Sequence, residues 1–172
     1  MSKISSIVTF FTLLMTFAFS NVFAGEAGTM EHEKHEVHSE KTLAVAKAFL
    51  EAAGSGDAEA MKALMADDFQ WHNEGDFSIP WIGTWGPKDK VFSEFMPAFG
   101  EGLKVTSWTT DYSFSNRENA VFMGTMSAIV TKTGEDTGVF SWAVRVHVVD
   151  GKVKRWHWFE DSYAVSKAYH GN

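Results

Sequence analysis

The second half of the chain consists of strand-like segments separated by short turns, and this pattern restricts the fold more than any other feature. These segments are rich in β-branched and aromatic residues, and they cover residues 103–114, 120–131, 137–149 and 153–161. Asp150 and Gly151 form a strong hairpin signal between the last two segments. Four strands joined by short turns predict an antiparallel meander.

Helical periodicity precedes these strands. Apolar residues recur at helical spacing over residues 42–53, and the run Gly54-Ser55-Gly56 is expected to end that helix. Asp57 is the expected N-cap of a second helix. Pro87 suits the first position of a third helix, and Pro97 is expected to kink or end it. The sequence therefore predicts three helices before the meander.

A short strand over residues 69–72 and a loop over residues 73–86 separate the second helix from the third. Helices that gather on one side of an antiparallel sheet define an α+β fold. A curved sheet covered by three N-terminal helices makes a cone with an open end, which is a natural place for a ligand pocket.

The first 24 residues have the features of a secretory signal peptide. Lys3 precedes an apolar run over residues 7–19. This segment ends with small residues at positions 22 and 24, a pattern that predicts cleavage after Ala24. A membrane anchor is the alternative, but the run is shorter than the ~20 residues of a span. The mature protein is expected in the periplasm or outside the cell, free of the membrane. Its expected parts are a polar, His-rich tether (25–41), a domain (42–166) and a C-terminal tail (167–172).

Composition narrows the class of partner. The chain has 15 basic and 22 acidic residues and a formal net charge of −7, which argues against binding to nucleic acid or to an anionic membrane. It has no cysteine, so packing of its 7 tryptophans and 15 phenylalanines must hold the domain together. No cofactor is expected.

A histidine-rich tract lies in the tether. His32, His35 and His38 are three residues apart, so they would lie near one face of a helix and could bind a transition metal weakly. The alternative is a solvated tether without a metal. In the domain itself no short stretch combines histidine and carboxylate at metal-ligand spacing, and no metal site is predicted there.

Several short motifs together resemble one family. They are Gly54 to Asp57, the run Asp67-Asp68-Phe69-Gln70-Trp71-His72, the passage from Ile79 to Val91, and the turn from Val149 to Val153 before an aromatic strand that ends in Asp161. The chain resembles the SnoaL-like domains of the nuclear transport factor 2-like superfamily, which are related to polyketide cyclases and ketosteroid isomerases. The resemblance implies a cone-shaped, cystatin-like α+β barrel and a homodimer formed through the sheet. It does not specify an activity, because this fold carries many functions.

The last strand supplies candidate catalytic residues. Successive side chains of a strand point to opposite faces, so Trp156, Trp158 and Glu160 share one face. In the related cyclases an Asp of this strand is the proposed general base, and its position corresponds here to Trp158, which cannot take a proton from carbon. The resemblance leaves Asp161, which closes the strand, and Glu160, which lies on the Trp158 face. His72 is the candidate partner of Asp161 as an acid–base pair; the alternative is a histidine at the rim of the cone that bonds to backbone or water.

Other candidates lie around the expected pocket. Glu74 and Asp76 are near the region where related isomerases keep a carboxylate base, and we interpret them as solvated loop charges. The residues expected to line the pocket as a flat apolar wall are Trp71, Trp81, Trp85, Trp142 and Trp158.

Two functions remain open from the sequence. One is a cofactor-free isomerase, cyclase or hydrolase that transfers protons on a small organic ligand. The other is a non-catalytic module that binds a small apolar or aromatic molecule in the periplasm. Metal delivery by the His-rich tether is a third, weaker interpretation.

Overall fold

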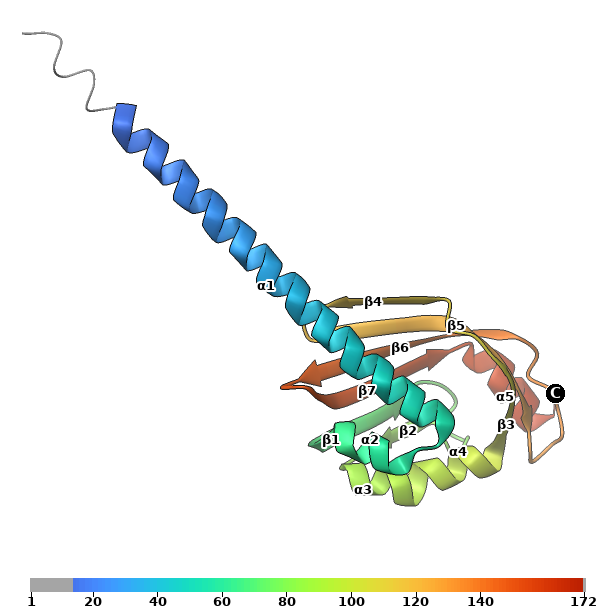
Figure 1. Ribbon diagram of the computed structural model, residues 1–172. Helices are drawn as coiled ribbons and strands as arrows, with labels where there is room; N and C mark the ends of the chain where they lie inside the picture. The colour runs from blue at the N-terminus through green and yellow to red at the C-terminus, as the bar shows by residue number, and fades with distance from the viewer. Residues whose placement is uncertain (1–13, 172) are drawn as a thin grey trace, which may run out of the picture. The chain divides into compact units, whose positions relative to one another are not determined.

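The computed structural model describes residues 14–171, with side chains from residue 28 onwards. The chain divides into two compact units, residues 1–37 and residues 38–172. The described part of the first unit belongs to the long helix α1 (Leu14–Ser55), which also includes the predicted tether (Figure 1). Residues 1–13 of the predicted signal peptide lie outside the described residues. No helix within the described residues is both long and apolar enough to cross a membrane.

The remaining helical segments are short, and they are α2 (Ala58–Leu64), α3 (Lys88–Lys90), the π-helical turn η1 (Val91–Phe95), α4 (Met96–Gly102) and α5 (Ser162–His170). Asp57 caps α2 as expected, because its side chain accepts a hydrogen bond from the Ala60 amide at 3.0 Å. The expected helix after Pro87 is present as α3, η1 and α4. Pro97 does not end it: the π turn widens the helix just before Pro97, and the helix continues to Gly102.

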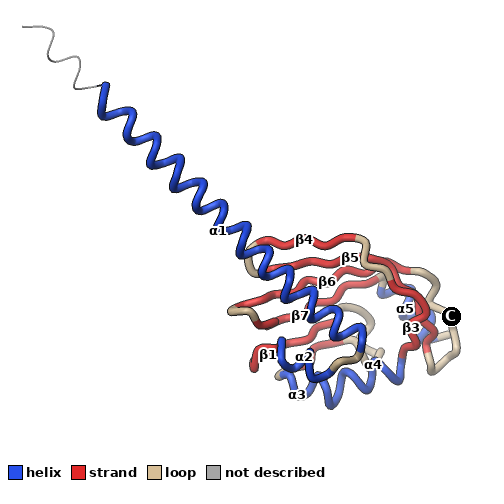
Figure 2. The backbone as a smooth tube through the Cα atoms, in the orientation of Figure 1, coloured by secondary structure: helices blue, strands red, loops and turns tan. Residues whose placement is uncertain are grey.

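One sheet contains all the strands: β1 (Met65–Asn73), β2 (Gly83–Trp85), β3 (Leu103–Trp108), β4 (Tyr112–Asn116), β5 (Asn119–Val130), β6 (Phe140–Val149) and β7 (Lys152–Glu160). Its order is β2-β1-β7-β6-β5-β3, and β4 also pairs with β5 (Figure 2). The predicted meander is confirmed for β5, β6 and β7, which pair antiparallel. β1 adds to β7 in parallel, so that Trp71 lies opposite Trp156 and His72 opposite His157.

The predicted single strand over residues 103–114 is divided in two. β3 and β4 both pair with β5, and residues 109–111 connect them while still bonding to it: the Thr109 amide donates to the Thr125 carbonyl at 2.9 Å. The connection approaches β5 closely at Gly124, where a Cβ atom would lie 2.0 Å from the Thr109 carbonyl oxygen. A residue without a side chain is therefore required at this close approach.

Helices cover one face of the sheet within the second unit. Phe49 of α1 packs against Trp71 and Trp156, with ring centroids 6.3 and 5.5 Å apart. Phe95 of η1 packs on Trp71 at 4.6 Å. All four side chains are buried, and they belong to one apolar core. The predicted α+β class, with helices over a curved sheet, is confirmed.

The C-terminal helix α5 was not anticipated as an element. Asp161 caps it by accepting hydrogen bonds from the amides of Tyr163 and Ala164, and Gly171 ends it with a φ of 73°. Residues 167–170 of the predicted tail therefore lie in a helix, and Ala168 is buried.

Candidate functional site

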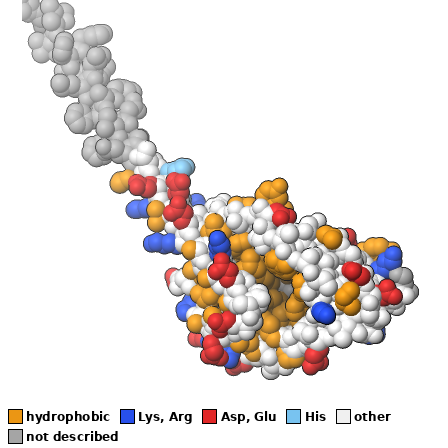
Figure 3. Space-filling model, turned by 45° about the vertical axis from the view of Figure 1, so that its right-hand side comes forward, with side chains coloured by type: hydrophobic (Ala, Val, Ile, Leu, Met, Phe, Trp, Pro, Cys, Tyr) orange, Lys and Arg blue, Asp and Glu red, His pale blue; other side chains and the backbone are white. Residues whose placement is uncertain are grey.

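A cavity of about 430 Å³ lies between the helices and the covered face of the sheet. This is within the range of roughly 300–1,000 Å³ typical of small-molecule sites. α1 contributes Leu50, Ala53 and Gly54 to its wall, and the η1–α4 segment contributes Phe95, Met96 and Phe99. Apolar side chains gather in a hollow of this unit in Figure 3. The cavity suits a largely apolar organic molecule.

Five tryptophans line this cavity: Trp71, Trp81, Trp108, Trp156 and Trp158. The first, second and last of these are among the five that the sequence suggested. The other two candidates lie outside the lining. Trp85 packs against Phe95 at 4.9 Å, and Trp142 stacks on Trp108 at 4.3 Å and on Trp158 at 5.0 Å.

Glu160 brings a carboxyl group to the apolar wall. It follows Trp156 and Trp158 on the same face of β7, as strand alternation predicts. The Trp158 indole Nε1–H donates to Glu160 Oε2 at 2.8 Å, whereas Oε1 is buried and has no hydrogen-bond partner in the described structure. Burial raises the pKa of Glu160 to about 7; the indole bond opposes this shift, and the Asp161 charge adds to it.

Polar donors also belong to the lining. Asn73 accepts from the Trp71 indole at 2.8 Å and donates to the Trp81 carbonyl at 3.0 Å, which fixes its amide in the wall. The indole Nε1 atoms of Trp81 and Trp156 are buried and have no partner in the described structure. Buried donors usually have acceptors, so these two N–H groups are exceptions; the Trp142 indole, outside the lining, is a third.

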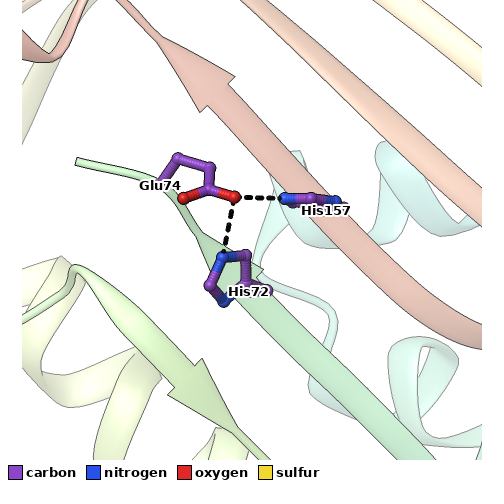
Figure 4. A group of neighbouring side chains, drawn as sticks. All are labelled: His72, Glu74 and His157. Carbon is purple, nitrogen blue, oxygen red and sulfur yellow. Dashed lines mark hydrogen bonds and ion pairs between the residues drawn. The ribbon is translucent and has the colours of Figure 1, made fainter.

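His72 and His157 point to the opposite side of the sheet from the cavity. Each alternates with cavity-lining residues, Trp71 and Asn73 in β1 and Trp156 and Trp158 in β7. The Glu74 Oε1 atom lies 2.9 Å from His157 Nε2 and 3.1 Å from His72 Nε2 (Figure 4). Hydrogen bonds from His157 and His72 lower the pKa of Glu74.

The expected pair of His72 and Asp161 is not assembled in the cavity, because neither residue belongs to its lining. Asp161 caps α5. Asp76 also contacts α5. Its carboxylate accepts a hydrogen bond from Ser166 at 2.7 Å and lies 3.1 Å from His170 Nε2. Hydrogen bonds from Ser166, Ser78 and His170 lower the pKa of Asp76.

Two cavity tryptophans, Trp108 and Trp156, and one side-chain cluster were not predicted from the sequence. The alternation that puts Trp158 and Glu160 on one face also includes Trp156, so that residue could have been found. Trp108 depends on the pairing of β3 with β5, which no local signal reveals. The cluster of His72, Glu74 and His157 joins residues more than eighty positions apart, through the parallel pairing of β1 with β7.

Solved structures share this fold. An NTF2-like protein from Burkholderia xenovorans is 21% identical, with a TM-score of 0.68 over 76% of this chain and 97% of that one. TerC, co-crystallised with polyporic acid, is 16% identical, with a TM-score of 0.63 over 76% and 98%. A proposed SnoaL-like polyketide cyclase from Mesorhizobium loti is 19% identical, with a TM-score of 0.55 over 67% and 95%. The fold is thus that of the nuclear transport factor 2-like proteins.

Residues 46–156 match the sequence profile of the SnoaL-like domain, so the chain belongs to the SnoaL-like domain family. No curated protein matches the chain in sequence. Membership in this family indicates either isomerase- or cyclase-like chemistry or the binding of a ligand.

Proposed function

We propose that the cavity binds a flat, largely apolar organic molecule carrying a carbonyl group, and that Glu160 moves a proton on it. The observation that carries this proposal is the Glu160 carboxyl, whose pKa is raised to about 7 in a wall of tryptophans. A group that titrates near neutral pH is populated in both protonation states there. It can therefore take up a proton and give it back within one catalytic cycle.

The unpartnered donors suggest where the carbonyl oxygen would bind. When a base removes a proton next to a carbonyl, negative charge develops on the oxygen. The indole N–H groups of Trp81 and Trp156 are buried in the same lining as Glu160 and can donate to that oxygen. Hydrogen bonds in a dry site are stronger than in water, so these donors favour the charged intermediate.

Glu160 is the only ionisable side chain among the described residues of the lining. A single carboxyl suffices for isomerisation, because it can remove a proton from one carbon and return it to another. Hydrolysis needs an activated water in addition. We therefore favour the isomerase-like reaction over the hydrolase-like one.

The experiment uses 2-tetralone, a flat bicyclic ketone, as a probe in D₂O. NMR follows the loss of the proton signals next to its carbonyl. The wild-type protein is expected to accelerate this exchange above the buffer rate, and Glu160→Gln is expected to return it to the buffer rate. If both proteins leave the buffer rate unchanged although tryptophan fluorescence reports binding, the catalytic part of the proposal is wrong.

The second candidate function is a non-catalytic binding module, and the presence of Trp158 at its position in β7 favours it. This residue occupies the position of the base proposed for related cyclases, and its indole N–H holds one oxygen of Glu160. Polyporic acid, steroids and aromatic acids form a suitable panel for fluorescence quenching. Binding of one of them without a new product and without deuterium exchange by NMR supports this alternative.

Export and dimerisation are part of the same proposal. Lys3 and the apolar run over residues 7–19 support a signal peptide. Exposed aromatic side chains support a self-association surface on the sheet: Tyr112 and Phe114 of β4 are 68% and 55% exposed. N-terminal sequencing of the exported protein is expected to begin at Gly25, and a chain that retains Met1 would contradict cleavage of the signal peptide.

Sedimentation velocity is expected to give a dimer for the wild type and a monomer for Phe114→Glu. A wild-type monomer would contradict the proposed dimer.

A further inference from the structure

Three side chains converge on the face of the sheet opposite the cavity, and no step of the proposed reaction uses them. They come from two strands: His72 and Glu74 lie in and just after β1, and His157 lies in β7. Parallel pairing puts His72 directly opposite His157, and the Glu74 amide bonds to the Trp158 carbonyl at 3.1 Å. The backbone therefore holds the three residues at one place on the surface (Figure 4).

We propose that His72, Glu74 and His157 bind a divalent transition-metal ion, with Zn²⁺ as the preferred one. Each residue offers one ligand atom, and all three atoms lie within 4.8 Å of one another. Two imidazole nitrogens and one carboxylate oxygen make a donor set that suits zinc and its neighbours in the first transition row. Mg²⁺ and Ca²⁺ prefer oxygen ligands alone, so this set disfavours them.

The distances from Glu74 to the two histidines fit a tetrahedral ion with small adjustments. Zinc lies about 2.0–2.2 Å from nitrogen and oxygen ligands, so two ligands of a tetrahedral site are about 3.3 Å apart. Glu74 Oε1 lies 3.1 Å from His72 Nε2 and 2.9 Å from His157 Nε2. Shifts of a few tenths of an ångström would bring each carboxylate–imidazole pair to ligand spacing. The ligand atoms of the two histidines lie within 4.8 Å of each other, and the ion would draw them together. Three protein ligands leave the fourth position for water.

The surroundings orient one histidine and leave access for an ion. His72 Nδ1 lies 2.5 Å from Thr84 Oγ1 of β2, and a polar partner on the second nitrogen is typical of a metal-binding histidine. The His157 ring packs against Phe159 with centroids 4.2 Å apart, which limits its rotation. The histidine side chains are only 17% and 16% exposed, whereas that of Glu74 is 47% exposed. An ion can therefore enter beside Glu74.

The bound ion would link β1 to β7. The same strands carry Trp71 and Asn73, and Trp156 and Trp158, on their cavity face. An ion that binds the folded protein and not the unfolded chain raises the free energy of unfolding. Metal binding is thus expected to stabilise the wall of the cavity from the opposite side of the sheet, without taking part in the reaction.

The test is a titration of the untagged full-length protein with Co²⁺ and with Zn²⁺. Visible d–d absorption reports tetrahedral Co²⁺, and calorimetry gives the affinity and stoichiometry for Zn²⁺. The variants are His72→Asn, Glu74→Gln and His157→Asn. The matched control replaces His32, His35 and His38 by alanine, because this exposed tract is the competing source of imidazole ligands.

One tight ion per chain is expected for the wild type and for the triple-alanine control. His72→Asn and His157→Asn are expected to lose it, and Glu74→Gln is expected to bind at least ~10-fold more weakly. If circular dichroism shows that His157→Asn does not fold, the affinity of Glu74→Gln decides the test. The Glu74 side chain is nearly half exposed, so its replacement is expected to leave the fold intact. Wild-type affinity in all the folded single variants overturns the proposal, and so does loss of binding in the triple-alanine control.

Discussion

The indole Nε1–H of Trp158 donates a hydrogen bond to the Glu160 carboxylate at 2.8 Å, and the two residues stand two positions apart on the cavity face of β7. Among the described lining residues Glu160 is the one with an ionisable side chain, and this bond joins it to the apolar wall of the cavity. Burial raises the pKa of Glu160, and the bond moderates that shift because it stabilises the charged form.

Replacing Trp158 by Phe is expected to raise the pKa of Glu160 above the wild-type value. Phe keeps an aromatic ring in the wall but has no N–H to donate, so burial acts unopposed by this bond. Side-chain ¹³C NMR of glutamate against pH measures the shift. Trp108→Phe is the control, because the Trp108 indole donates to Thr110 at 3.2 Å and not to Glu160. Equal pKa values in wild type and Trp158→Phe would contradict the assigned role of the indole.

The stability of Glu160→Gln is expected to differ from wild type in a pH-dependent way. The pKa is raised from 4.5 in the unfolded chain to about 7 in the folded protein, so folding takes up a proton between these values. Below about pH 4 both states are protonated, and the shift has no effect on stability. Above about pH 7 the folded protein must bury a carboxylate, which costs at most about 3 kcal/mol.

Gln cannot ionise, so the variant is expected to be more stable than wild type at about pH 8, by up to about 3 kcal/mol, and nearly equal at about pH 4. Urea unfolding at both pH values measures this difference. Glu101→Gln, a change of an exposed carboxyl, is the control. A pH-independent difference between Glu160→Gln and wild type would contradict the buried, proton-binding state of this carboxyl.

Gly102 is expected to tolerate no side chain. A Cβ atom there would lie 2.0 Å from the Trp81 ring, which is buried in the cavity wall. Gly102→Ala should therefore lower the free energy of unfolding by about 2 kcal/mol or more. Gly100→Ala, in the same helix with open space around the new Cβ, should raise it by about 0.5–1 kcal/mol. Similar effects of the two changes on urea unfolding would mean that Trp81 does not pack against Gly102.

Filling the cavity is expected to weaken ligand binding while the fold is kept. Ala53 lines the cavity from α1, and Ala53→Leu adds three carbon atoms to its space. We expect at least a ~10-fold loss of affinity for any panel compound that quenches tryptophan fluorescence, about 1.4 kcal/mol. Ala63→Leu makes the same change at an exposed position of α2 and serves as the control. Undiminished binding to Ala53→Leu would place the ligand elsewhere.

The fold was largely predictable because its signals are local. The turn at Asp150 and Gly151 and the cap at Asp57 are short-range features, and the structure contains both. The division of the strand over residues 103–114 was not predictable in this way. It depends on a close approach to Gly124, a residue of another strand.

The candidate site was predictable only where strand alternation decides it. Trp158 and Glu160 share a face in any extended strand, and both line the cavity. The role of His72 could not be read from its neighbours in sequence. The parallel pairing of β1 with β7 turns it towards His157 and Glu74, and only the assembled sheet reveals that pairing.

The most direct test of the account is the pKa of Glu160 in the wild-type protein. Its ¹³C carboxyl resonance can be assigned by its absence in Glu160→Gln and followed across the pH range in which the protein stays folded. We expect a midpoint at about 7, as for a buried acid–base group beside tryptophan. A midpoint at the ordinary value of 4.5 would contradict it, because the carboxyl would then be solvated and ionised throughout the neutral range.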